Sequence, residues 1–124
     1  MWKTQPDDEY IKRVKKWPKK HHRELLAVHN NLDTFLGALN CGAKPEHARF
    51  GFIHPEPRGV LAIDQKGGGS SLKETRLYTF PEADTQVVHL ITLGDKDSQE
   101  ADVRYASEFV DQLAHREEGS SNAR

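Results

Sequence analysis

Cationic side chains flank two consecutive strand-like runs in the second half of the chain. Arg76 lies in the first run, about residues 73–80, and Lys96 follows the second run, about residues 86–93. Both runs are rich in β-branched and aromatic residues, and turn formers at residues 81–84 separate them. A hairpin with an arginine and a lysine at its rim is a compact platform for an anionic ligand, because a planar guanidinium suits phosphate oxygens.

A second group of cations lies near the N-terminus. Residues 11–23 contain seven Lys and Arg and no acid, although the net charge of the whole chain is only −1. These residues are Lys12, Arg13, Lys15, Lys16, Lys19, Lys20 and Arg23. Such a block creates a local positive field that could attract phosphates or an acidic protein partner. A solvated helix face explains the same pattern equally well.

Two helices in succession are expected before residue 42. Pro6 and the acids that follow it form a good helix start, since proline is tolerated in the first turn and acids suit the positive end of the helix dipole. Apolar residues recur at helical spacing as far as Trp17, and Pro18 breaks that helix. A stronger stripe from Leu25 to Leu39 predicts a second helix of about twenty residues, which ends at Asn40-Cys41-Gly42.

The remaining elements are mostly strands. Strands are predicted at about residues 1–5, 49–54, 59–66, 73–80 and 86–93. The glycine-rich segment 67–71 is predicted to be a turn, because it lacks the Gly-Lys-Ser/Thr ending of a phosphate-binding loop. Asp97 and Glu100 are spaced as in a capping box, so a last helix begins there. Residues 1–115 are expected to form one domain, and the polar residues 116–124 a flexible tail.

The predicted fold class is α+β. Consecutive strands joined by short hairpins pair antiparallel, so the strands form a small antiparallel sheet. The two N-terminal helices bury their stripes on one face, the C-terminal helix lies beside the sheet, and the other face stays partly open. The run at residues 86–93 is apolar on both faces, which indicates a central strand covered on both sides.

Composition excludes several classes of protein. The chain has 124 residues, 35% of them hydrophobic, which suits one domain with a modest core. No apolar run approaches the roughly 18 residues of a membrane span, and the first residues lack the apolar core of a signal peptide. A lone Cys41 fits a reducing cytoplasm. The seven histidines show no metal-ligand spacing, and neither a metal nor another cofactor is expected.

The order of elements resembles the RelE/ParE superfamily of bacterial toxins, and the RelE-like branch in particular. The residues that carry this resemblance are Leu72-Lys73-Glu74-Thr75-Arg76-Leu77-Tyr78, Val87-Val88-His89-Leu90-Ile91-Thr92-Leu93-Gly94-Asp95-Lys96 and Ser98-Gln99-Glu100-Ala101-Asp102-Val103. The resemblance implies a metal-independent endoribonuclease that cuts mRNA, free or on the ribosome, and that a cognate antitoxin protein neutralises. Cleavage would proceed by attack of a 2′-hydroxyl on the adjacent phosphate.

The resemblance also implies roles for particular residues. Arg76 and Lys96 would stabilise the negative charge that develops on the phosphate, from opposite sides. Lys66 and Lys73 would each act as a base or merely neutralise charge. Tyr105 lies near the position of a helix-borne tyrosine in some members. Tyr78 shares a strand face with Arg76 and could stack on a base. The N-terminal cations Lys15, Lys16, Lys19, Lys20 and Arg23 are candidates for RNA contacts.

Other interpretations stay open at this point. Arg76 could instead form a surface ion pair with Glu74 or Glu82, and acids flank Lys96 where many relatives have two basic residues. His89 is expected to be a hydrogen-bonded core histidine, while His54 could reach the open sheet face. A ParE-like toxin, which poisons DNA gyrase by binding, is one alternative. A non-toxic module that binds RNA or an acidic protein through the N-terminal block is the other.

Overall fold

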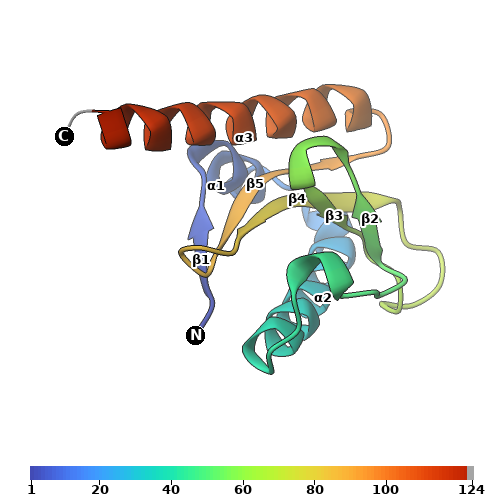
Figure 1. Cartoon of the computed structure of the whole chain (residues 1–124). Helices are drawn as coiled ribbons and strands as arrows, with labels where there is room; N and C mark the ends of the chain where they lie inside the picture. The colour runs from blue at the N-terminus through green and yellow to red at the C-terminus, as the bar shows by residue number, and fades with distance from the viewer. Residues whose placement is uncertain (123–124) are drawn as a thin grey trace.

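The structure is a computed structural model that describes the backbone of residues 1–122 and the side chains of residues 1–116. The chain folds into a five-stranded sheet between helices (Figure 1). The strands are β1 (Lys3–Pro6), β2 (Ile53–Pro55), β3 (Leu61–Ile63), β4 (Thr75–Glu82) and β5 (Val87–Asp95). The α-helices are α1 (Asp8–Lys15), α2 (His22–Asn40) and α3 (Gln99–Asn122). Short 3-10 helices are η1 (Lys19–His21), η2 (Pro45–His47) and η3 (Pro57–Gly59).

The strands follow the order β1-β5-β4-β3-β2 across the sheet. The four strands from β2 to β5 pair antiparallel with their neighbours, as the short connections between them require. Strand β1 pairs parallel to β5 at the other edge, with Thr4 opposite Val88. The predicted α+β class is therefore confirmed, with β5 as a central strand.

The first core lies between the sheet and α2. The apolar stripe of α2, including Val28, Leu32 and Phe35, belongs to one buried cluster with Leu77 of β4 and Leu90 of β5. Half-buried side chains of α1 add to the same cluster, so both N-terminal helices bury their apolar residues on this side. This arrangement confirms the prediction for the two helical stripes.

The second core lies on the opposite face of the sheet, under α3. Ala106 is fully buried there against Tyr78 and Ile91, and α3 contacts β4, β5 and η3 (Figure 1). The prediction that this face is partly open is therefore wrong for the area over β4 and β5. The spacing of the apolar residues of α3 predicts a buried stripe, but it does not indicate which face of the sheet that stripe covers.

An irregularity in β4–β5 pairing sets which residues reach the second core. Tyr78 pairs with Thr92 whereas Thr79 pairs with Leu90, so Ile91 is the extra residue of a β-bulge. The bulge places both Ile91 and Leu90 in apolar surroundings, Ile91 in the second core under α3 and Leu90 in the first core. A strict alternation of side chains along β5 would not describe its second half.

Several predicted element ends differ from the observed ends. Helix α1 begins at Asp8 rather than at Pro6, and Asp7 is its N-cap, whose carboxylate accepts the N–H of Glu9 at 3.2 Å. Strand β4 continues through Pro81 and Glu82, which were predicted as turn residues. The predicted Asp97 cap is replaced by Asp95, whose carboxylate accepts the N–H groups of the residues before α3.

The last helix is longer than expected. Helix α3 extends to Asn122, through most of the segment predicted as a flexible tail, and residues 123 and 124 lie outside the described residues. Among the described helices, none is long and apolar enough to cross a lipid bilayer. The strand predicted at residues 59–66 is also shorter than expected, since β3 covers only Leu61–Ile63.

Gly94 of β5 provides a test of how α3 is seated. A Cβ atom at this position would collide with the Asp102 carboxylate and the Ser98 hydroxyl. We expect Gly94→Ala to push α3 from the sheet and lower the free energy of unfolding by about 2–3 kcal/mol, measured by urea denaturation. Gly37→Ala is the control, because α2 has open space at Gly37, and it should raise that free energy by about 0.5–1 kcal/mol. Unchanged stability in Gly94→Ala would contradict this packing.

Candidate functional site

The structure brings three of the predicted cations to one end of the β4–β5 hairpin. Arg76 on β4 pairs with Gly94 on β5, while Lys73 lies two residues before β4 and Lys96 immediately follows β5. Because the two strands are antiparallel, the start of β4 and the end of β5 meet at the same end of the sheet. This convergence agrees with the predicted platform for an anionic ligand.

Arg76 is the most enclosed of these cations. Its side chain is 15% exposed, and its guanidinium lies 2.9 Å from Glu74 Oε1 and 3.5 Å from Glu56 Oε2. Its Nε is buried and has no hydrogen-bond partner among the described residues. The predicted ion pair with Glu74 is therefore present, and Glu82 instead accepts from His89. Two carboxylates therefore hold the guanidinium in place.

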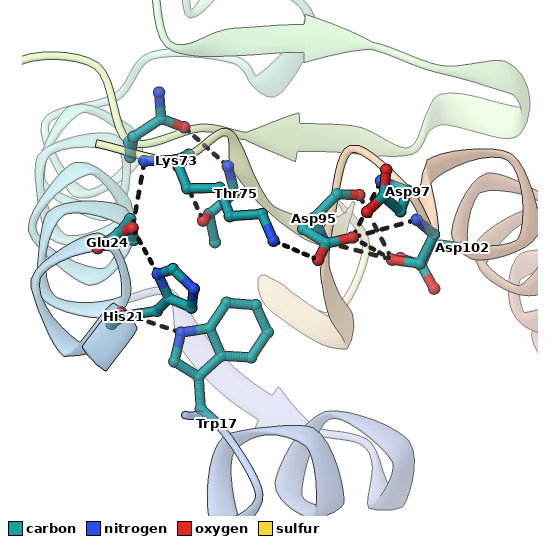
Figure 2. Close-up of polar contacts among 10 residues, drawn as sticks. Trp17, His21, Glu24, Lys73, Thr75, Asp95, Asp97 and Asp102 are labelled. Atoms are coloured by element: carbon teal, nitrogen blue, oxygen red, sulfur yellow. Dashed lines mark hydrogen bonds and ion pairs between the residues drawn. The ribbon is translucent and has the colours of Figure 1, made fainter. Parts of the chain in front are cut away.

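Lys73 and the loop that carries Lys96 are organised by one carboxylate. Lys73 Nζ donates to Asp95 Oδ2 at 3.2 Å, and Asp95 Oδ1 accepts the backbone N–H groups of Asp97 and Ser98 (Figure 2). Partial burial of Asp95 acts to raise its pKa, but the hydrogen bonds from Lys73 and Ser98 prevail and lower it. The Lys96 side chain is exposed and makes no hydrogen bond or ion pair within the described part of the chain.

A second carboxylate fixes the backbone of Lys73. Glu24 of α2 is buried, and its Oε2 accepts the backbone N–H of Lys73 at 3.1 Å and lies 2.9 Å from His21 Nδ1 (Figure 2). Burial raises the pKa of Glu24, but the bonds from His21 and Lys73 outweigh it, so the net shift is downward. Glu24 thus joins the start of β4 to η1, which carries two of the predicted RNA-binding lysines.

The N-terminal block forms an exposed surface on this side of the molecule. Its predicted RNA contacts are Lys15, Lys16, Lys19, Lys20 and Arg23, which we call the basic surface. All five residues are exposed, and none makes an ion pair with another described residue. The basic surface lies at the end of α1, on η1 and at the start of α2, next to the loop between β3 and β4, where a Cβ on Gly69 would approach Arg23.

The other two predicted catalytic residues, Tyr105 and Lys66, have polar contacts of their own. Tyr105 is on α3, and its hydroxyl donates to Asp7 Oδ2 at 2.8 Å, so it joins α3 to the start of α1. Partial burial and that carboxylate raise the pKa of Tyr105 to about 12. Lys66 donates to the carbonyl of Gly51 at 3.2 Å and lies 3.7 Å from Asp64, with 60% of its side chain exposed.

Tyr78 cannot stack on an RNA base in this structure. It faces the same side of the sheet as Arg76, as predicted, but α3 covers it and its exposure is 0%. Burial, followed by the negative charge of Asp102, raises its pKa. The prediction failed because it assumed an open face above β4. His89 is buried as expected, with its Nε2 3.1 Å from Glu82 Oε1.

Polar residues that were not predicted as site residues gather over β2 and β3. Glu56 follows β2, and His54 lies within it, with His54 Nε2 2.6 Å from Asp64 Oδ2. The sequence predicted only that His54 could reach the open face of the sheet, and it did not indicate a pairing with Asp64. Pairing of such short strands depends on the register of residues far apart in the chain, which composition does not specify.

An apolar cavity of about 660 Å³ adjoins these residues. Glu56 lies at its margin, and Phe50, Ile53, Leu61 and Phe80 contribute to its lining. Phe50 also stacks on Phe52, with ring centroids 5.0 Å apart. Aromatic side chains of this kind stack on unpaired bases in RNA complexes. Glu56 therefore borders this cavity and contacts Arg76 as well.

The described residues contain no group of three or more His, Cys, Asp or Glu side chains arranged to hold a metal ion. Comparison of the chain with protein-family models, curated proteins and solved structures gave no significant match. The function is therefore argued from the fold and from the geometry of these side chains.

The acid pH dependence of stability tests the role of Asp95. Its pKa is lowered from 3.8 in the folded protein, so its contribution is present above about pH 4 and is lost as pH falls through the folded pKa. We expect Asp95→Asn to lower the free energy of unfolding by about 1 kcal/mol at pH 7, because hydrogen bonds to Lys73 and the α3 loop are lost. Urea denaturation should show this difference shrinking towards pH 3, and a difference independent of pH would contradict the assignment.

Proposed function

We propose that this chain is a RelE-like toxin of a bacterial toxin–antitoxin module and acts as an mRNA endoribonuclease. The observation that carries the proposal is the convergence of Arg76, Lys73 and Lys96 at one end of the β4–β5 hairpin. The observed order of elements supports it, since two N-terminal helices, a mainly antiparallel sheet and a C-terminal helix are what the resemblance implies. A lone, unpaired Cys41 is compatible with action in the cytoplasm.

The proposed chemistry needs a cation at the phosphate and a group that takes the proton of the 2′-hydroxyl. Arg76 provides the planar donor set that binds phosphate oxygens and stabilises the charge of the transition state. Glu56 and Glu74 both touch its guanidinium and are carboxylates able to accept a proton. The two carboxylates outnumber the single guanidinium, so a phosphate would have to displace them to bind Arg76.

The basic surface supplies contacts to RNA outside the reacting phosphate. Its five cations are free to neutralise phosphates, and the Glu24–Lys73 hydrogen bond places one end of this surface beside the site. In the module, a cognate antitoxin would cover the charged surface and block access of mRNA, free or on the ribosome. The contacts between the basic surface and RNA phosphates would not depend on RNA sequence, because phosphate contacts do not distinguish one base from another.

Induced expression in a bacterial host tests the nuclease. We expect the wild type to arrest growth and to produce new mRNA 5′ ends, and Arg76→Ala to lose both, because removal of a transition-state donor lowers cleavage by about 10²–10³-fold. Arg104→Ala is the matched control, since Arg104 forms an exposed ion pair with Glu100 on α3 and should leave arrest intact.

The other outcomes of that experiment separate the alternatives. Growth arrest without new mRNA ends would favour a gyrase poison of the ParE type. Absence of arrest would favour a binding module, for which RNA affinity should survive Arg76→Ala but fall when Lys15, Lys16, Lys19 and Lys20 are neutralised together. Either result would contradict the proposed nuclease.

The cavity beside Glu56 predicts a separate effect on substrate binding. We expect Phe50→Ala to raise KM for RNA cleavage by about 5- to 100-fold while kcat changes little, because loss of one stacked base costs about 1–3 kcal/mol. Steady-state cleavage of a short RNA measures both constants. Phe109→Leu on α3 is the control, since Phe109 lies outside this cavity. An unchanged KM in Phe50→Ala would exclude the cavity as a base site.

A further inference from the structure

His54 of β2 and Asp64, which directly follows β3, form a close pair. His54 Nε2 lies 2.6 Å from Asp64 Oδ2, and Asp64 Oδ1 accepts the backbone N–H of Lys66 at 2.8 Å. The Asp64 side chain is only 5% exposed, so both of its oxygens are engaged in a sheltered position. A buried carboxylate with two fixed partners holds an imidazole in one orientation, as supporting groups do for catalytic and metal-bound histidines.

The sheet register places this pair on the same face as Arg76. His54 pairs with Ala62, which pairs with Tyr78, and Ala62 and Tyr78 both lie in the core under α3. Asp64 lies two residues after Ala62, and Arg76 lies two residues before Tyr78. Because side chains alternate along extended chain, Asp64 and Arg76 point to the same side as Ala62 and Tyr78. Arg76 in turn reaches Glu56, two residues after His54. The imidazole, the guanidinium and the carboxylates therefore share one part of one face.

One nitrogen of the imidazole remains available to a ligand. Since Nε2 is directed at Asp64, the nitrogen that can meet a substrate is Nδ1, which has no hydrogen bond to any described residue. The His54 side chain is 28% exposed, unlike its partner. The ring is thus anchored at one nitrogen and accessible at the other, which is the arrangement that a proton donor to a bound substrate requires.

We propose that His54 is the general acid of the RNA cleavage reaction, an inference that rests on the proposed nuclease function. The 2′-oxygen forms a bond to phosphorus as its proton passes to a carboxylate beside Arg76. The bond from phosphorus to the 5′-oxygen breaks, and His54 Nδ1 gives its proton to that leaving oxygen. The products are a 2′,3′-cyclic phosphate and a 5′-hydroxyl. Proton exchange with water then restores the carboxylate and the imidazolium.

Asp64 is a positioning residue in this scheme. It keeps Nε2 occupied, so that Nδ1 faces the substrate. A histidine–carboxylate pair is not sufficient by itself. His89 and Glu82 form a similar pair, but the His89 ring is enclosed between Phe80 and Phe109 and only 11% of its side chain is exposed. Accessibility beside Arg76 distinguishes His54.

The test compares two RNA substrates that differ only in the leaving atom. One is an ordinary oligonucleotide and the other carries a bridging 5′-sulfur at the cleavage position, a leaving group that departs without protonation. Both are offered to the purified protein free and in the A site of programmed ribosomes. On the ordinary RNA, His54→Ala should lower kcat by about 10²–10³-fold with KM within about twofold, and Asp64→Asn should lower kcat by about tenfold.

On the sulfur-containing RNA, both variants should cleave at close to the wild-type rate. A purely structural defect would slow both substrates equally, so an equal loss on both would overturn the inference. His54→Gln replaces His54→Ala if the alanine variant does not fold by circular dichroism, and His89→Gln is the control expected to keep its rate on ordinary RNA.

The remaining outcomes also decide the matter. A wild-type rate in His54→Ala on ordinary RNA would overturn the inference and leave the nuclease proposal standing. Rescue by sulfur of Lys66→Met, with no rescue of His54→Ala, would assign the acid to Lys66 instead. Failure of the wild type to cleave either RNA in either setting would overturn both the nuclease proposal and the role of His54.

Discussion

Burial of β5 on both faces is the constraint on which the rest of the structure depends. Val88 and Leu90 need apolar cover on one side of this strand and Ile91 on the other. Helices α1 and α2 cover the first side and α3 the second, while β1 and β4 pair with its two edges. Strand β5 is thus enclosed by helices on both faces and by strands at both edges. This fixes the end of β5, so the loop that follows it holds Lys96 beside the start of β4.

The polar residues of the site are arranged around carboxylates rather than left as free cations. Glu24 and Asp95 fix Lys73 at its backbone and at its ammonium, and Glu74 and Glu56 hold Arg76. Pairing of this kind keeps partly buried cations satisfied in the absence of a ligand, and it also makes them weaker binders of phosphate. RNA would then be attracted mainly by the exposed basic surface, whereas the paired cations would act at the reacting phosphate.

The order of elements could be predicted because each helix or strand has a characteristic pattern of apolar and turn-forming residues within its own segment. The stripe of α2, the double-sided run of β5 and the stop at Gly42 depend only on nearby residues, and all three are observed. The face covered by α3 could not be predicted, because a helical stripe indicates that a helix is buried but not where. For the same reason, the sequence did not predict that Tyr78 is buried or that His54 pairs with Asp64. Both features depend on contacts between segments that are distant in the chain.

The end groups of the cleaved RNA test the central claim most directly. Purified protein would be incubated with an oligonucleotide, free and on programmed ribosomes, in the presence of a chelator, and the products would be weighed by mass spectrometry. Attack by the 2′-hydroxyl predicts one fragment with a 2′,3′-cyclic phosphate and one with a 5′-hydroxyl. Fragments with a 3′-hydroxyl and a 5′-phosphate, or an intact oligonucleotide in both settings, would contradict the account.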